Sequence, residues 1–585
     1  MKTPLLSFVF LFLSLYSAAQ GDSTTRIRPY THSGFVKTDY LAAPMPDTKT
    51  RLGLWGIHYL FNLEHGLYAG PGYYGAITGR WGGFFSLGIN GGFKTSLHKQ
   101  LTLDAGAYFG GGGGAAAPDG GGALILPHAQ LGYQFPRFAL FAGYSYIHFF
   151  DGGSIKGSQI NYALHIPLQL RHSAIANNGK SILYKDYARS GWDVPERQLD
   201  FTLRLTQLRA KAPSREFVSG ASLAGRKISL LGFELGIPLN PNNFLFARAD
   251  GGYQGLRGGY LNVLFGYGHQ FLLFNGQTRL AAKLGAGPAG GGDVDTKGGL
   301  LISPDVGLSQ QIISNLSLNL QAGYLLSPDK YFYGTTTSLG LQYHIHQSGL
   351  RRSGARDRSG ARDRNRSDAQ GSGWNREQGS RRSDARGITR GEAGDKSAGE
   401  TPESSKSPAG DKTQDGARDT LPGGGHPNSS HYAGGTFRGF ELSAGQEIYF
   451  NAQRLDINPT NMQQFFTQLH FYMNRTLYGV VDVSFANFGK AGAYGEGAFG
   501  IGAATSKVPA LSAFVQVLAG GSGGGGVDVG QGFIVKPSAG IQYRLHPVLN
   551  VQATAGWVKA IDGKLSSPAC SIGLSYGISL LHPKN

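Results

Sequence analysis

The chain has 585 residues, of which 92 are glycine and 11 % are aromatic, and its formal net charge at pH 7 is +17. Glycine has no three-residue period, which excludes collagen, and its abundance disfavours a helical protein because glycine destabilises helix interiors. Since Cys570 is the only cysteine, no disulfide can form within the chain, and packing and hydrogen bonds must stabilise it.

The first residues have the composition of an export signal. Lys2 supplies a positive charge, Leu5 to Leu15 form an apolar core, and Ser17-Ala18-Ala19 provides the small residues that are typical of a signal-peptide cleavage region. We therefore expect residues 1–20 to be a signal peptide and the mature chain to leave the cytoplasm. No later run of about 18 uninterrupted apolar residues occurs, which excludes transmembrane helices.

One loop-and-strand pattern occurs three times along the chain. Each copy has a glycine run, an aspartate, further glycines, an apolar run that ends in proline, a polar-apolar strand and Ala-Gly-aromatic. Pro127, Pro304 and Pro537 occupy the same place in the three copies. The chain is therefore predicted to contain three versions of one β-rich unit. We place these units at 31–170, 197–346 and 434–580, with a connector at 171–196.

Each unit is predicted to hold about eight strands. In the second unit these are 199–208, 227–237, 243–252, 258–269, 277–285, 298–312, 316–326 and 335–346. Polar and apolar residues alternate in several of them, as in Leu316-Ser317-Leu318-Asn319, which puts each kind on one face. Connections after strands two, four and six are short, and those after strands one, five and seven tend to be longer.

A small glycine turn follows the third strand of each unit and departs from that trend. Gly-Gly at 82–83 and 258–259 and Ala-Gly at 491–492 come directly after it. Short and long connections nevertheless lie at opposite ends of each unit, as in an antiparallel barrel that spans a membrane. About 9–11 tilted residues let a strand cross the bilayer, and the sheet must close because lipid cannot satisfy an open edge.

Two all-β architectures agree with this pattern. Three tandem up-and-down antiparallel transmembrane β-barrels of about eight strands each are the first, and one wide barrel of about 24 strands is the alternative. The glycine runs are expected to be flexible outer loops. A proline inside a strand should mark a bulge or an unpaired position, which applies to Pro127, Pro304 and Pro537.

The arrangement of strands and loops resembles the small eight-stranded outer-membrane β-barrel proteins. The signal that ends in Ala-Gln and the segment RGFELSAGQ at 438–446 are similar to exported barrels of Bacteroidetes-type bacteria. The start GxELxAG within that segment is also similar to the conjugative-transposon protein TraO. The resemblance implies a barrel in the outer membrane.

Residues 347–433 form a polar segment of low complexity, with RSGARD repeated at 352–357 and 358–363. Because apolar residues are nearly absent, we expect this segment to be a disordered linker. It carries 16 basic and 12 acidic side chains in 351–420, which is +4 of the total +17. Aromatic residues other than Trp374 are missing between the charges, so the segment is predicted to be a solvated spacer that contacts periplasmic partners or peptidoglycan rather than nucleic acid.

Several short patterns could carry chemistry, and each has a simpler explanation. Residues 285–290 match the dinucleotide fingerprint GxGxxG, but a strand rather than a helix is predicted to follow. His344 and His346 lie two apart on a strand and could begin a metal site. We expect a loop at 285–290 and a strand end without metal at the two histidines.

Two further groups lie in or near loops. His148, Asp151 and Ser154 could form a triad-like set, as some lipid A deacylases have a His and a Ser near such a strand end. Aspartates in the glycine-rich loops could bind calcium, but turn formation explains them better; they are Asp119, Asp293, Asp295 and Asp528. We predict no catalytic residues, no cofactor and no metal.

Export, strand pattern and loop pattern together predict an integral outer-membrane β-barrel protein. Its expected role is non-enzymatic: structural, anchoring or envelope assembly, with outer-membrane lipid and lipopolysaccharide as partners. Three alternatives stay open. They are porin-like transport through a single wide barrel, a lipid A-modifying enzyme, and a secreted soluble β-sandwich adhesin.

Overall fold

The computed structural model describes residues 29–46, 48–182, 197–313, 315–347, 435–505 and 510–583. The predicted signal peptide 1–20 and, apart from Gln347, the predicted linker 347–433 lie outside the described residues. The described part is almost entirely β-strand, with three 3₁₀ turns, η1 (Glu64–Gly66), η2 (Ile175–Asn177) and η3 (Phe274–Gly276). Within the described ranges, no helix is long and apolar enough to cross a membrane.

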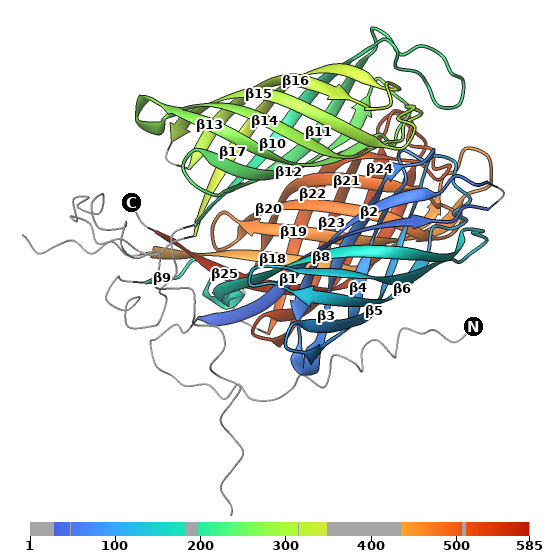
Figure 1. Cartoon of the computed structure of the whole chain (residues 1–585). Helices are drawn as coiled ribbons and strands as arrows, with labels where there is room; N and C mark the ends of the chain where they lie inside the picture. Colours follow the sequence, from blue (N-terminus) through green and yellow to red (C-terminus); the bar gives the residue numbers. More distant parts are fainter. Residues whose placement is uncertain are drawn as a thin grey trace, which may run out of the picture. The chain divides into compact units, whose positions relative to one another are not determined.

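The first eight strands form one antiparallel barrel, drawn in blue to cyan in Figure 1. They are β1 (Tyr30–Ala43), β2 (Leu52–Asn62), β3 (Leu67–Thr78), β4 (Phe85–His98), β5 (Leu101–Gly113), β6 (Leu124–Gln134), β7 (Ala139–Phe149) and β8 (Lys156–Ala174). Each strand pairs with the next along the chain, and β8 returns to pair with β1. We call this ring barrel 1.

The second barrel, drawn in green to yellow, repeats the arrangement. Its strands are β10 (Arg197–Lys211), β11 (Lys227–Pro238), β12 (Asn243–Gln254), β13 (Leu261–Leu273), β14 (Thr278–Gly290), β15 (Leu300–Ile313), β16 (Leu316–Leu326) and β17 (Tyr333–Gln347). It closes through pairing of β10 with β17. All eight strands that the sequence predicts for this unit are present, and most extend beyond their predicted ends. We call this ring barrel 2.

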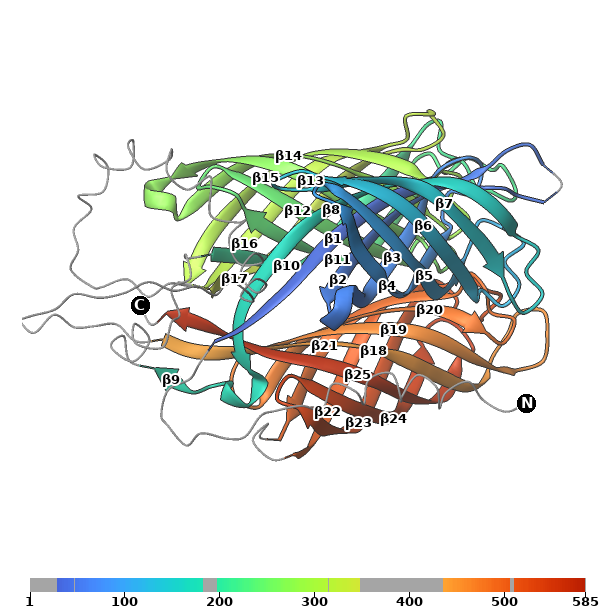
Figure 2. The same cartoon turned by 60° about the horizontal axis from the view of Figure 1, so that its bottom comes forward.

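The third barrel is drawn in orange to red and is barrel 3. Its strands are β18 (Gly435–Ala452), β19 (Thr460–Tyr472), β20 (Leu477–Phe488), β21 (Gly495–Ala504), β22 (Leu511–Gly523), β23 (Phe533–His546), β24 (Leu549–Ala560) and β25 (Ser566–Pro583). Pairing of β18 with β25 closes it, as the turned view in Figure 2 also shows. The fold is thus three eight-stranded barrels, and the alternative of one barrel with 24 strands is wrong because the last strand of each unit returns to its own first strand.

The end of barrel 1 adds a small extra pairing to barrel 3. Strand β8 runs to Ala174, η2 follows, and the two-residue strand β9 (Ser181–Ile182) pairs with the start of β18. Ala174 and Ser173 also pair with β25. The beginning of the predicted connector therefore supplies a short sheet edge to barrel 3.

The three corresponding prolines interrupt one ladder in each barrel. Pro127 is register partner to Ala107 of β5, but the ladder between β6 and β7 skips from Ile125 to His128 without a change of register. Pro304 and Pro537 lie in the same kind of gap, between β15 and β16 and between β23 and β24. The prediction of an unpaired position is confirmed, and the reason is that proline has no N–H to donate.

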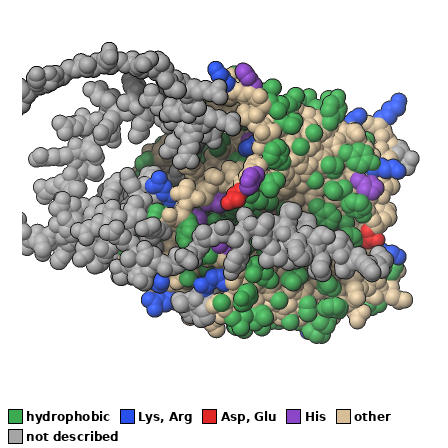
Figure 3. All heavy atoms as spheres, turned by 90° about the horizontal axis from the view of Figure 1, so that it is seen from below, with side chains coloured by type: hydrophobic (Ala, Val, Ile, Leu, Met, Phe, Trp, Pro, Cys, Tyr) green, Lys and Arg blue, Asp and Glu red, His purple; other side chains and the backbone are tan. Residues whose placement is uncertain are grey.

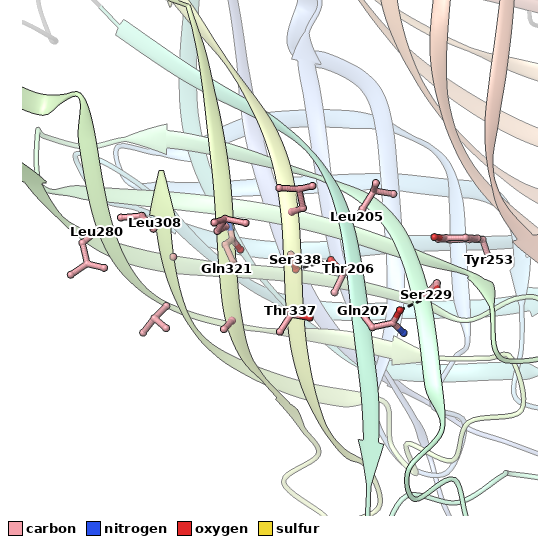
Figure 4. A pocket seen from close by; sticks show the side chains of 15 residues that line it. Leu205, Thr206, Gln207, Ser229, Tyr253, Leu280, Leu308, Gln321, Thr337 and Ser338 are labelled. Carbon is pink, nitrogen blue, oxygen red and sulfur yellow. Dashed lines mark hydrogen bonds between the residues drawn. The ribbon is translucent and has the colours of Figure 1, made fainter. Parts of the chain in front are cut away.

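The strands bury charged and polar side chains, together with apolar clusters, on one face and expose apolar side chains on the other. In β10, Thr202 and Arg204 are 2 % and 3 % exposed, whereas Leu205 is 50 % exposed. Figure 4 shows this wall of barrel 2, where Thr206 hydrogen-bonds to Ser338 at 2.8 Å. Leu205, Leu280 and Leu308 lie exposed along the same wall. On the face in Figure 3, hydrophobic side chains likewise outnumber charged ones. A water-soluble barrel would have the opposite polarity.

We expect barrel closure to be detectable by a cross-link between β10 and β17. Thr206 and Ser338 are register partners and their hydroxyl oxygens lie 2.8 Å apart, so Thr206→Cys with Ser338→Cys in a Cys570→Ser background should form a disulfide under mild oxidation. The readout is a reducible shift in gel migration. The control pair Thr206→Cys with Ser309→Cys lies on β10 and β15, which are not neighbours, and should stay reduced. Equal cross-linking of both pairs would contradict the closed ring.

Candidate functional sites in the lumens and glycine loops

The lumen of barrel 2 is filled by a network of charged side chains. Arg204 Nη1 donates to Glu234 Oε2 at 2.9 Å, and Lys283 Nζ donates to the same carboxylate at 2.8 Å. Arg248 Nη1 donates to Asp305 Oδ2 at 3.0 Å. These residues come from β10, β11, β12, β14 and β15, so the network crosses the barrel from wall to wall. Its charges are matched one to one, because Asp250 faces Arg204 at 3.5 Å.

In the lumen of barrel 3, one lysine contacts three carboxylates. Lys536 Nζ lies 2.9 Å from Glu447 and 3.2 Å from Asp482, and it also contacts Glu496. Tyr449 donates its hydroxyl to Glu496 at 2.9 Å. All of these side chains are buried. Removing the single lysine would therefore leave three carboxylates without their common partner.

Barrel 1 holds histidines and tyrosines as well as ions. Tyr68 donates to Asp104 Oδ1 at 2.6 Å, and Tyr74 donates to Asp39 Oδ2 at 2.9 Å. Lys37 Nζ is 3.6 Å from Asp39, and His128 Nε2 is 3.5 Å from Asp104. Paired polar side chains thus occupy all three lumens, but a different set of side chains does so in each barrel.

The lumen networks leave little free space. A cavity of about 40 Å³ lies beside Glu234 and Lys283 in barrel 2, and one of about 10 Å³ lies beside Lys536 in barrel 3. A single water needs a cavity of roughly 10–15 Å³ for its centre to move in, so the larger space holds about three waters and the smaller at most one. Eight strands enclose a lumen that side chains can fill, and here they fill it.

The structure places His344 in a hydrogen-bond chain inside barrel 2. Its Nδ1 lies 2.7 Å from Asp200 Oδ1 and its Nε2 lies 2.7 Å from Ser317 Oγ. Asp, His and Ser in this order resemble a catalytic triad. Ser317 and His344 are each only 2 % exposed, however, so the hydroxyl is closed off from a substrate. The sequence drew attention to His344 but not to its partners. Ser317 lies on the neighbouring strand β16, and Asp200 reaches His344 only because β17 closes the barrel onto β10.

The other predicted candidates do not assemble into a site. His148 is half-buried at the end of β7 and packs against Phe150, with ring centroids 4.7 Å apart. Asp151 is exposed, and its backbone carbonyl accepts a hydrogen bond from Gly121. His346 belongs to β17, and only its backbone is described. Among the described residues, no group of three or more His, Cys, Asp or Glu is arranged to hold a metal ion.

The segment Gly285 to Gly290, which matches GxGxxG, is the second half of strand β14 and not a loop. The loop proper begins at Gly291. Two of the predicted loop aspartates accept backbone hydrogen bonds: Asp295 from the Lys297 amide at 2.9 Å, and Asp293 from the Val218 amide at 2.9 Å. The first is of the kind that shapes turns, and the second joins the loop to the one that follows β10.

The glycine loops have one backbone conformation in all three barrels. We define them as residues 114–123, 291–299 and 524–532, between the fifth and sixth strands. Gly122, Gly299 and Gly532, each five residues before the corresponding proline, have φ angles of 94°, 96° and 104°. This left-handed conformation favours glycine. The loops are therefore folded structures with a common shape.

Asp119 distinguishes the loop of barrel 1 from the other two. Thr296 and Val529 occupy the equivalent positions, eight residues before the proline. The Asp119 side chain is buried and accepts a hydrogen bond from the Gly114 amide at 2.9 Å. Burial raises the pKa of the Asp119 carboxyl to about 7, although the hydrogen bond from Gly114 opposes this shift.

No known family model matches the chain, and no curated protein sequence matches it. Among solved structures, similarity is found to a de novo designed transmembrane β-barrel (15 % identity, 24 % of this chain and 94 % of that chain, TM-score 0.17). It is also found to OccK11 (OpdR) of Pseudomonas aeruginosa (8 % identity, 94 % and 96 %, TM-score 0.20). A third is the siderophore receptor PirA of Pseudomonas aeruginosa (9 % identity, 95 % and 81 %, TM-score 0.25). Likenesses this distant assign neither an activity nor an arrangement of barrels to the chain.

Replacing Lys536 in the lumen of barrel 3 should destabilise that barrel strongly. Lys536→Met leaves Glu447, Asp482 and Glu496 without their shared partner, and breaking such a buried pair costs about 3–5 kcal/mol. The measurement is the free energy of unfolding by urea in detergent micelles, with heat-modifiable gel migration as the readout of the folded fraction. Lys564→Met, in the exposed loop after β24, is the control and should change stability by less than about 0.5 kcal/mol. Equal stability of the two variants would contradict the role of the network.

The Asp119 carboxyl should make stability depend on pH. Its pKa in the folded chain is raised to about 7 from an ordinary value near 4, so its contribution is complete below pH of about 4 and is lost as pH rises through 7. We expect Asp119→Asn to flatten the fall of the thermal unfolding midpoint between pH 4 and pH 8. The exposed Asp456→Asn is the control. A parallel fall in wild type and Asp119→Asn would exclude this origin.

Proposed function

We propose that the chain is an integral outer-membrane protein whose three filled barrels have a non-enzymatic structural or anchoring role in the envelope. The observation that carries the proposal is the polarity of the strands: buried charges inside each closed ring and exposed leucine, isoleucine and valine outside. Hydrocarbon is the solvent that favours this arrangement, and closure leaves no unpaired strand edge for it to meet.

The ends of the strands support the same location. Exposed aromatic residues lie near the short turns, including Tyr133 in barrel 1, Tyr267 in barrel 2 and Tyr543 in barrel 3, as expected of an interfacial girdle. The short turns also expose Lys99, Arg137 and Arg475. We assign this end to the periplasmic side, where these cations would meet lipid phosphates, and the longer loops to the outside, where lipopolysaccharide is the partner.

The alternatives have less support. Transport through a single wide barrel required a 24-stranded ring, which the strand pairings exclude. Transport through a single lumen would require the charged networks of barrels 2 and 3 to open. A lipid A-modifying enzyme would need an accessible nucleophile, but Ser317 is buried. Among the described residues, the contact shown for the His148 side chain is with Phe150, which is not a triad partner. A soluble β-sandwich would bury its apolar side chains between two sheets.

Bilayer recording and extraction test the proposal together. The full chain should require detergent for extraction from membranes and should show no conductance steps in a planar bilayer at about 1 M salt, where the Debye length is about 3 Å. A porin reconstituted in the same lipid is the positive control. Steady conductance would replace the structural role with transport, and release by alkaline carbonate without detergent would exclude a transmembrane protein.

A further inference from the structure

The small turn after the third strand is the same structure in each barrel. We define the third-strand turns as residues 79–84, 255–260 and 489–494. Their first glycines, Gly79, Gly255 and Gly489, have φ angles of 105°, 91° and 96°. This equivalence aligns Gly492 with Gly82 and Gly258, one residue later than the sequence pattern suggested.

Each third-strand turn meets the glycine loop of a different barrel. The Gly82 amide of barrel 1 donates to the Lys297 carbonyl of barrel 2 at 2.7 Å. The Gly258 amide of barrel 2 donates to the Gly530 carbonyl of barrel 3 at 3.1 Å. Gly492 of barrel 3 lies directly against the Gly120 carbonyl of barrel 1. The three accepting or facing carbonyls are equivalent, because Gly120, Lys297 and Gly530 each lie seven residues before the corresponding proline.

The direction of these contacts is consistent around the chain. Barrel 1 inserts its turn into the loop of barrel 2, barrel 2 into that of barrel 3, and barrel 3 into that of barrel 1. Such head-to-tail contacts use two different surfaces on each unit, and they either form open filaments or close into a ring. Here the third contact returns to the first unit, so every turn and every loop has a partner.

The contact surfaces have no room for side chains. A Cβ on Gly258 would lie 2.7 Å from the Ser522 carbonyl oxygen and 2.9 Å from Gly532 Cα. A Cβ on Gly492 would lie 2.8 Å from Asp119 Oδ1 and 3.0 Å from the Gly122 amide. Most of these obstacles are backbone atoms, which cannot move aside as a flexible side chain can. Close backbone approach therefore explains why glycine occupies this position of the turn in all three copies.

Side chains on the barrel walls add to each contact. Trp55 and Phe265 join barrels 1 and 2, with ring centroids 5.3 Å apart. Phe201 and Phe471 join barrels 2 and 3 at 5.0 Å. Phe85 of barrel 1 and Phe485 of barrel 3 are 6.3 Å apart and both buried. These outward-facing rings would otherwise face lipid. Each contact between barrels therefore combines a backbone contact at the glycines with an aromatic contact between the barrel walls.

We propose that the third-strand turn and the glycine loop form an association module whose partner is another barrel with the same two surfaces. Recognition is through backbone amides and carbonyls, so it tolerates sequence divergence: the equivalent carbonyls belong to Gly120, Lys297 and Gly530. The module would hold the three barrels together even after the chain between barrels 2 and 3 is cut, and it leaves no surface free for a fourth barrel.

The test is to cut the full chain after it has folded. A protease site is inserted between Gln347 and Gly435, and an affinity tag is placed at the N-terminus of the mature chain. Cleavage in detergent then cuts the chain into a tagged fragment with barrels 1 and 2 and a second fragment with barrel 3. We expect barrel 3 to remain bound to the tagged fragment. Gly258→Val with Gly492→Val changes both joints of barrel 3 and should reduce its retention at least tenfold. Gly497→Val in β21 is the matched control, since a Cβ there meets nothing within 4 Å.

Two further measurements keep the outcome unambiguous. Heat-modifiable migration of each fragment reports whether every barrel is folded, and Gly258→Ala with Gly492→Ala replaces the valine pair if that pair fails to fold; it should lower the temperature at which the fragments separate. Separation of the wild-type fragments on cleavage would overturn the proposal. Full retention of a folded double variant would also overturn it, because the pairing of β8 and β9 with barrel 3 would then suffice. Neither result depends on whether the barrels conduct ions.

Discussion

Closure of each eight-stranded sheet on itself is the constraint from which the other features follow. A strand edge has unpaired amides and carbonyls, and hydrocarbon cannot satisfy them. Pairing of β1 with β8, β10 with β17 and β18 with β25 removes every such edge. The return of each last strand to its own first strand also sets the lumen size, which is small enough for side chains to fill.

A narrow lumen then determines which side chains lie inside. Apolar residues are needed on the outer face, so the inner face receives the polar residues, and burial requires them to pair. Barrel 2 pairs its cations and anions one to one, whereas barrel 3 shares Lys536 among three carboxylates. The hydrogen bonds that join Asp200, His344 and Ser317 pair buried polar groups in the same way. The filled lumens are the reason why we propose a structural role.

Glycine has two separate uses in this chain. In Gly122, Gly299 and Gly532 it permits a left-handed backbone that gives the three loops one shape. In Gly82, Gly258 and Gly492 it permits the backbone of one barrel to approach another. The first use shapes a surface, and the second lets an equivalent surface fit against it. Repetition of both in every unit is what allows the head-to-tail contacts to close after three steps.

The sequence by itself determined the fold class, the number of units and the strands, because alternation, turn length and internal repetition are local properties that one chain displays directly. It also located the proline gaps, since the missing N–H of Pro127, Pro304 and Pro537 acts within its own ladder. Only the tertiary structure decided between three rings and one, because eight-strand and 24-strand closure have the same local pattern. It alone brought Asp200, Ser317 and His344 together and showed that glycine runs expected to be flexible loops are partners of turns in other barrels. Those contacts join residues more than a hundred positions apart through backbone atoms, and backbone contacts leave no side-chain signature other than glycine itself.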